Sequence, residues 1–153
     1  MRLFTDQSVQ KIFHFAITDV AFIKTSLNIN VEPFCCTKVM SKLIRTYTQD
    51  HGLKDLILEL HGKQINKEQQ QSNWGESNLS QKQLEYAAND VLYLIKIYRK
   101  LLEMMNSRSQ LKSGINIYDL NQKAQSFLPG LVELLINGYG DKDGGWGISL
   151  FSH

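Results

Sequence analysis

Residues 79–91, LSQKQLEYAANDV, begin the most clearly signalled element of this 153-residue chain. Ser80, followed three residues later by Gln83, matches a capping box, in which each of the two side chains binds a backbone N–H at the start of a helix. Apolar residues then recur at helical spacing as far as about Met105. The pattern therefore predicts a long helix that begins at Ser80.

Two polar residues lie on the flank of this helix's apolar face. At about 100° per residue, Tyr86 and Asp90 fall one turn apart beside that face. A carboxylate there lies at the rim where a helix meets a sheet edge, and it could help to hold a cation. Spacing alone favours a plainer interpretation, an ordinary surface acid beside an interfacial tyrosine. The apolar face itself consists of Leu84, Ala88, Val91, Ile95, Tyr98, Leu102 and Met105.

The N-terminal part of the chain alternates short strands with helices. Lys11–Ala16 (KIFHFA) predicts a buried strand, and residues 18–23 pass from a strand end into a helix with Thr18 or Asp19 near the cap. Val31–Phe34 predicts a second short strand, in which Pro33 favours an edge position or a strand end. Asp19 thus stands at a strand-to-helix junction, where α/β proteins often carry functional side chains, although spacing alone favours an N-cap role.

Two more helices are predicted before the long one. Residues 36–47 have an apolar face, and their other side carries Lys38, Lys42 and Arg45, a stripe that is usually only solvated but could contact phosphates. A short helix over residues 53–60 ends at Gly62. Residues 64–78 predict a loop, in which Trp74 either anchors the loop to the core or stacks on a base.

Composition limits the class of protein. With 42% hydrophobic residues the chain can form one core, and a net charge of +2 is too small to indicate nucleic-acid binding by itself. No apolar run approaches the roughly 18–20 residues that span a bilayer, and the N-terminus lacks a signal peptide. Cys35 and Cys36 are predicted to be free thiols of a cytoplasmic protein. A redox or metal site that adds His51 and His61 is the less favoured alternative, because the spacing does not suit zinc.

An ordered series of motifs favours the functional interpretations of Asp19, Tyr86 and Asp90 over the plainer ones. K-I-F-H-F-A-x-x-D, H-G-L-K-x-L, S-x-W-G and L-S-x-x-Q-L-x-Y-A-A-x-D-V together closely resemble the ribonuclease D family of 3′→5′ exonucleases. The resemblance runs from about residue 5 to residue 105. It implies an α/β, RNase H-like exonuclease fold, rich in helices, in the four-carboxylate group whose third motif is Tyr-x-x-x-Asp. We expect residues 1–128 to form a partial exonuclease domain, and residues 129–153 a C-terminal helix, led by Pro129, with a mobile glycine-rich tail.

The resemblance also implies roles for individual residues. Asp19 and Asp90 match metal-binding aspartates of the second and third motifs, and Tyr86 matches the tyrosine that orients the attacking water. A pair of Mg²⁺ or Mn²⁺ ions needs several carboxylates to offset its charge. The implied substrate is the 3′ end of single-stranded RNA, or DNA, and the implied location is the cytoplasm. Candidate nucleic-acid-binding residues are His14, Lys38, Lys42, Arg45, Lys54 and Trp74.

Two departures from the family pattern bear on activity. Asn73 replaces the usual aspartate before the tryptophan, for which we expect only a local effect on the loop. The first motif, Asp-x-Glu, has no counterpart, so half of the carboxylates and about three strands would be missing if the chain is complete. Missing strands would expose a sheet edge and apolar surface, which favours self-association. Three hypotheses remain, namely an exonuclease with a missing N-terminus, a non-catalytic remnant that binds nucleic acid or a partner, and an unrelated helical interaction module.

Overall fold

The computed structural model describes residues 2–65, 72–73, 75, 78–108, 111, 113–139 and 149–151. After the short helix α1 (Arg2–Thr5), strand β1 (Lys11–Phe13) leads through helix α2 (Ala16–Leu27) to strand β2 (Phe34–Cys36). The two strands pair in parallel, with Lys11 opposite Phe34 and Phe13 opposite Cys36. The order strand, helix, parallel strand is the α/β unit that the sequence predicts.

Both strands differ from their predicted bounds. β1 ends at Phe13, and α2 begins after Phe15, so Asp19 lies within the first turn of α2 rather than at its cap. β2 begins at Phe34, three residues later than predicted. Pro33 precedes the strand because it has no N–H to add to the ladder. Its carbonyl oxygen instead accepts a hydrogen bond from the Lys11 backbone nitrogen at 3.0 Å.

The ends of the helices agree with the sequence predictions where the signal comes from residues next to the helix end. The capping box is confirmed: Ser80 Oγ accepts from the Gln83 backbone nitrogen at 3.3 Å, and Gln83 Oε1 accepts from the Ser80 backbone nitrogen at 2.8 Å. Gly62 ends its helix with a positive φ of 65°. The helix predicted over residues 36–47 ends earlier, at Ile44. After β2, the described helices are α3 (Thr37–Ile44), α4 (Leu53–His61), α5 (Gln81–Ser107), α6 (Ile117–Ser126), α7 (Leu128–Ile136) and the 3₁₀ turn η2 (Ser149–Phe151).

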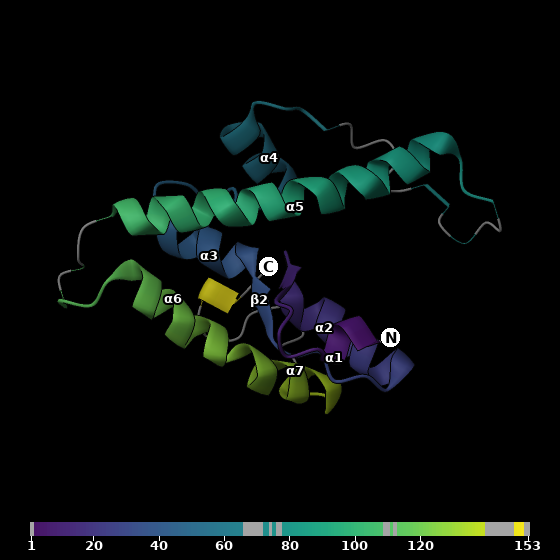
Figure 1. Ribbon diagram of the computed structural model, residues 1–153, viewed down its shortest axis with the longest axis horizontal. Helices are drawn as coiled ribbons and strands as arrows, with labels where there is room; N and C mark the ends of the chain where they lie inside the picture. Colours follow the sequence, from purple (N-terminus) through teal and green to yellow (C-terminus); the bar gives the residue numbers. More distant parts are fainter. Residues whose placement is uncertain are drawn as a thin grey trace.

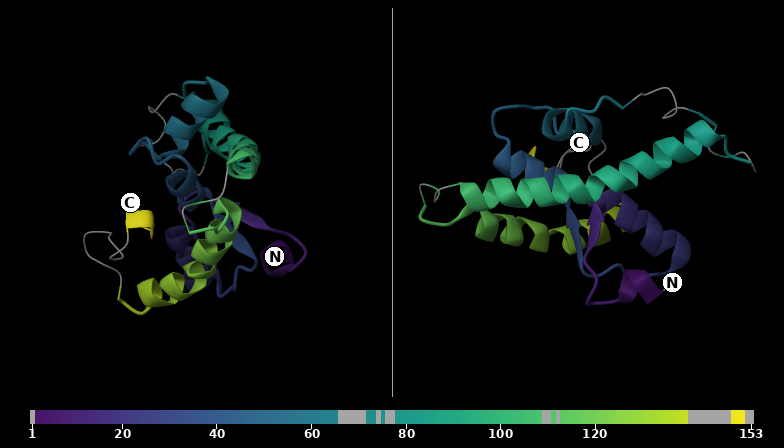
Figure 2. Two further views of the ribbon diagram at one scale, coloured as in Figure 1. Left: turned by 90° about the vertical axis from the view of Figure 1, so that its left-hand side faces the viewer. Right: turned by 45° about the horizontal axis from the view of Figure 1, so that its top comes forward.

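The long helix α5 runs along the molecule and packs against α3, α4 and α6 (Figure 1, Figure 2). Its buried residues include Ile97, Leu101 and Met105, which join side chains of α3, α4 and α6 in one core cluster. The predicted apolar face is therefore only partly correct. Leu84, Val91 and Ile95 are about half exposed or more, whereas the fully buried apolar residues Ile97, Leu101 and Met105 lie in the C-terminal half of α5.

A second core cluster joins the two ends of the chain. α7 packs along α2, and Leu128 and Val132 are buried together with Ala16 and Ile17. The structure thus brings the C-terminal helix into the same core as the strands. Residues 140–148 of the predicted tail lie outside the described residues. Among the described helices, none is both long enough and apolar enough to cross a membrane.

Candidate active site and nucleic-acid interface

Asp19 lies in the first turn of α2, the helix that follows β1 after two residues. The residue is exposed, yet the loss of water around its carboxyl group raises its pKa above the usual value. A cation beside the carboxylate would offset this desolvation, because an opposite charge favours the ionised form. Carboxylate oxygens are also the ligands that Mg²⁺ and Mn²⁺ prefer.

Tyr86 of α5 and Lys54 of α4 lie together in the structure. The Lys54 Nζ atom is 5.4 Å from the centre of the half-buried Tyr86 ring. Two residues that the sequence places in separate motifs therefore meet where α4 and α5 pack side by side. A lysine over a tyrosine ring is a favourable cation–π arrangement, and it leaves a positive charge beside Tyr86.

The other expected site residues are described less fully. Asp90 is on α5, one turn after Tyr86, but its side chain lies outside the described residues, as does Trp74 entirely. Among the side chains that are described, no group of three His, Cys, Asp or Glu residues could hold a metal ion. The donor type of Asp19 fits a divalent metal, whereas a two-ion site needs more carboxylates than Asp19 and Asp90 provide.

His14 binds other parts of the protein through both ring nitrogens. Nε2 lies 2.9 Å from the His51 carbonyl oxygen, and Nδ1 lies 3.0 Å from Thr37 Oγ1. Burial, followed by the nearby charge of Lys38, lowers the pKa of His14 to about 4, so the ring is neutral at pH 7. Because a carbonyl only accepts, Nε2 donates its hydrogen, and Nδ1 accepts from the Thr37 hydroxyl. This placement favours a structural role for His14 over the expected contact with nucleic acid.

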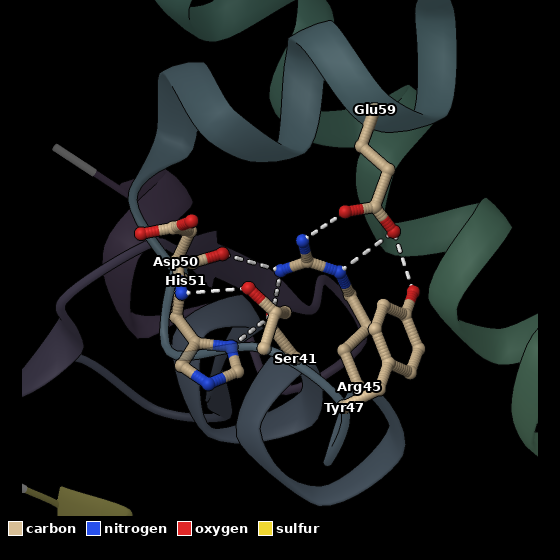
Figure 3. A network of polar contacts seen from close by, with 7 residues as sticks. Ser41, Arg45, Tyr47, Asp50, His51 and Glu59 are labelled. Atoms are coloured by element: carbon tan, nitrogen blue, oxygen red, sulfur yellow. Dashed lines mark hydrogen bonds and ion pairs between the residues drawn. The ribbon is translucent and has the colours of Figure 1, made fainter.

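Arg45 is not on a solvated face of α3, which corrects its expected role in phosphate binding. Its side chain is only 1% exposed and forms an ion pair with Glu59 of α4 (Figure 3). Nη1 also donates to Ser41 Oγ at 2.9 Å and to the Asp50 carbonyl oxygen at 2.7 Å. The helix ends at Ile44, so Arg45 turns inward instead of continuing the Lys38–Lys42 stripe.

The sequence gives little sign of the partners in this network. Tyr47 donates its hydroxyl to Glu59, and Ser41 Oγ lies 2.9 Å from His51 Nδ1 (Figure 3). By periodicity alone, Glu59 on the polar side of α4 looks like an ordinary surface acid. The signal that could point to the network is the position of His51 at the start of the H-G-L-K motif.

Cys35 and Cys36 are free, as the sequence predicts, and both are buried. Burial raises the pKa of the Cys35 thiol to about 12, so it is not ionised at neutral pH. The thiolate is the form that binds metals and reacts, and a metal or redox role for this thiol is therefore disfavoured.

Comparison with known proteins identifies the family. Residues 1–106 match the family described as 3′-5′ exonuclease. The chain belongs to this family. The matched residues include Asp19, Tyr86 and Asp90, together with both strands and the helices from α1 to nearly the end of α5.

Individual relatives support this assignment. The chain is 27% identical over 114 residues to ribonuclease D of Cronobacter turicensis, with 74% of this chain and 31% of the relative aligned. It is 39% identical to Brucella melitensis NrnC, a solved structure that superposes with a TM-score of 0.80 over 93% of this chain and 66% of NrnC. Ribonuclease D of Escherichia coli shares the fold, with a TM-score of 0.58 at 22% identity over 85% of this chain and 30% of that structure. The chain thus spans about a third of ribonuclease D and two thirds of NrnC.

Proposed function

We propose that this protein is a metal-dependent 3′→5′ exonuclease that removes nucleotides from RNA 3′ ends by a two-metal mechanism. The observation that carries the proposal is the family match over residues 1–106, which contains the motif residues Asp19, Tyr86 and Asp90 in order. The meeting of Tyr86 with Lys54 supports it, because two separate motifs converge on one place.

Each proposed site residue has a chemical task that suits its type. Asp19 and Asp90 would act as carboxylate ligands of Mg²⁺ or Mn²⁺. The chemistry that the bound ions supply is a lower pKa for the attacking water and stabilisation of the leaving 3′ oxygen. Tyr86 would hold the water in line with the phosphorus without adding charge to the site. Lys54 would place its ammonium group near the negative charge that develops on the phosphate.

Single-stranded RNA is the proposed substrate. Relatives of the chain carry the name ribonuclease D, and solved structures of Brucella melitensis NrnC include one bound to pGG and one with bound Mg²⁺. DNA is the alternative, since DNA polymerase I of Aquifex aeolicus is 34% identical over 100 residues, 58% of this chain and 17% of that protein. Competition between labelled RNA and DNA of one sequence would distinguish the two.

The test follows the shortening of single-stranded RNA labelled at its 5′ end, in the presence of Mg²⁺ or Mn²⁺. We expect a ladder of successively shorter products with the wild-type chain. Asp19→Asn should slow the shortening by about 100-fold or more, because it weakens metal positioning. Asp119→Asn is the matched control, since Asp119 is an exposed aspartate in the first turn of another helix, α6.

Two outcomes would count against the proposal. Equal rates for Asp19→Asn and the wild type would remove Asp19 from the site. Binding of RNA without any shortening by the wild type would favour the alternative function, a catalytically incomplete chain that only binds nucleic acid or a protein partner.

A further inference from the structure

A polar cleft of about 440 Å³ opens between α3 and the start of α4. Lys38 and Lys42 line it from α3, while Thr46, Thr48 and His51 line it from the segment that joins the two helices. The cleft is within the size range of small-molecule binding sites, roughly 300–1,000 Å³. The described residues that line it do not include Asp19, Tyr86 or Lys54, so the cleavage chemistry proposed above does not account for it.

Two positive charges converge on this cleft. Lys38 and Lys42 are one helical turn apart and therefore project from the same side of α3. Burial lowers the pKa of both, and the charge of Lys38 lowers the pKa of Lys42 further. The pKa of His51 is also lowered, first by burial and then by Arg45 and Lys42. An anion between the two lysines would relieve this repulsion.

Two carboxylates also line the cleft, and they limit where an anion can bind. Asp55 lies in the first turn of α4, where the helix dipole favours a negative charge. Its Oδ2 atom lies so close to Gly52 that a Cβ there would be only 2.6 Å away, so a larger residue at position 52 would require the Asp55 side chain to move. Asp50 is exposed at the rim. An anion is therefore expected at the lysine end of the cleft, away from both carboxylates.

The back wall of the cleft is held by the buried network around Arg45. Arg45 Nη1 donates to the Asp50 carbonyl oxygen at 2.7 Å (Figure 3). His14 Nε2 donates to the His51 carbonyl oxygen at 2.9 Å. Ser41 holds the His51 ring at 2.9 Å. The segment that faces the lysines is thus fixed before any ligand arrives, which lowers the entropic cost of binding.

We propose that this cleft binds one backbone phosphate of the RNA strand, through Lys38 and Lys42, as a subsite outside the cleavage centre. The choice of RNA as the ligand rests on the proposed function. Binding can nevertheless be measured with EDTA present, where metal-dependent cleavage cannot occur, so the two proposals fail separately.

The test measures the dissociation constant of a fluorescent single-stranded RNA by anisotropy, in EDTA, at several salt concentrations. For Lys38→Gln/Lys42→Gln we expect an increase in Kd of about 10-fold at low salt. The slope of log Kd against log salt should fall in magnitude by about 0.7, because the protein then neutralises one phosphate fewer. Lys38→Arg/Lys42→Arg should bind nearly as well as the wild type, because arginine keeps the charge.

Matched controls separate a local site from general charge. Lys100→Gln/Lys123→Gln removes two positive charges from exposed positions on α5 and α6, and it should leave Kd and the salt slope nearly unchanged. Asp50→Asn should tighten binding, because it removes a negative charge from the rim while the Asp50 carbonyl keeps its bond to Arg45. Circular dichroism would verify that each variant is folded.

The subsite would be overturned if Lys38→Gln/Lys42→Gln left Kd and the salt slope unchanged. It would also be overturned if the control Lys100→Gln/Lys123→Gln weakened binding equally. Failure of the wild type to bind RNA would overturn it too. Weaker binding in Lys38→Gln/Lys42→Gln, with no RNA shortening by the wild type, would leave the subsite standing and reject the nuclease proposal alone.

Discussion

His14 is kept neutral inside the fold, where it links the end of β1 to the segment before α4. The resemblance to the ribonuclease D family makes His14 a candidate for contact with nucleic acid. In the structure its hydrogen bonds to Thr37 and His51 instead hold the region from which α2 begins. A protonated ring would donate from both nitrogens, so Thr37 Oγ1 would have to accept from Nδ1 and direct its own hydrogen to the Phe13 carbonyl oxygen at 3.2 Å.

The unfolding free energy should therefore depend on His14 in acid. The pKa is about 4 in the folded chain and 6.5 as a reference for the unfolded chain, so the unfolded state takes up a proton first as pH falls. The stabilisation is complete above pH 6.5 and is lost as pH falls toward 4, by an amount on the order of 3 kcal/mol. Urea unfolding at several pH values should show a smaller loss for His14→Gln than for the wild type.

His61→Gln is the control for this measurement, because His61 is exposed at the end of α4. It should keep the acid sensitivity of the wild type. The same pH dependence in His14→Gln and the wild type would contradict a buried, neutral His14.

The ion pair between Arg45 and Glu59 should stabilise the fold more than an exposed pair does. Glu59→Gln leaves the buried guanidinium without an anionic partner, and we expect a loss of about 2–3 kcal/mol in unfolding free energy. Glu59 is 38% exposed, which keeps this loss below that of a fully buried pair. Glu103→Gln breaks the exposed Lys100–Glu103 pair and should cost about 0.5 kcal/mol or less in the same urea titration. Equal losses would contradict the structural role of Arg45.

At the residue scale, a prediction of a side chain's role succeeds or fails according to whether the burial of that side chain can be inferred from the sequence. Cys35 and Cys36 follow a proline at the start of a strand, and their prediction as free thiols is confirmed. The prediction that Arg45 extends a basic stripe is wrong, because α3 ends one residue before it and its side chain turns toward Glu59. Nothing in a helical periodicity indicates a partner fourteen residues away on another helix.

At the scale of elements, α5 shows how far local signals reach. Its start at Ser80 and its end near Met105 follow from the sequence, because capping and apolar spacing are properties of adjacent residues. Which side of α5 is covered depends on the helices that pack against it. Val91 is expected in the core and is 64% exposed, whereas Ile97 is fully buried. The sequence patterns considered above do not predict α6, although Asn116 caps it by accepting from the Asp119 backbone nitrogen at 2.7 Å.

The capping box offers a test of the start of α5. Ser80→Ala removes the acceptor for the Gln83 backbone nitrogen, and we expect a loss of about 1 kcal/mol in unfolding free energy. Ser80→Gly should cost only a few tenths of a kcal/mol, since glycine leaves the backbone accessible to water. Asn78→Ala, at an exposed position two residues before the cap, serves as the control in urea unfolding. A Ser80→Ala variant as stable as the control would show that this end of α5 contributes little to folding.

At the scale of the whole molecule, the sheet has two strands among the described residues, and each pairs along one edge. The N-terminal half of α5 carries exposed Leu84, Val91, Leu92 and Ile95. Self-association through the exposed sheet edge remains a prediction. The family and the fold are predicted correctly from the ordered motifs.

Asp90 on α5 is central to the proposed nuclease site. The most direct test compares the wild type, Asp90→Ala and Asn89→Ala on 5′-labelled single-stranded RNA with Mg²⁺ or Mn²⁺. We predict stepwise shortening from the 3′ end by the wild type and by Asn89→Ala, and a loss of about 100-fold or more in Asp90→Ala. Shortening that survives Asp90→Ala at the wild-type rate would contradict the assignment of Asp90 to the metal site.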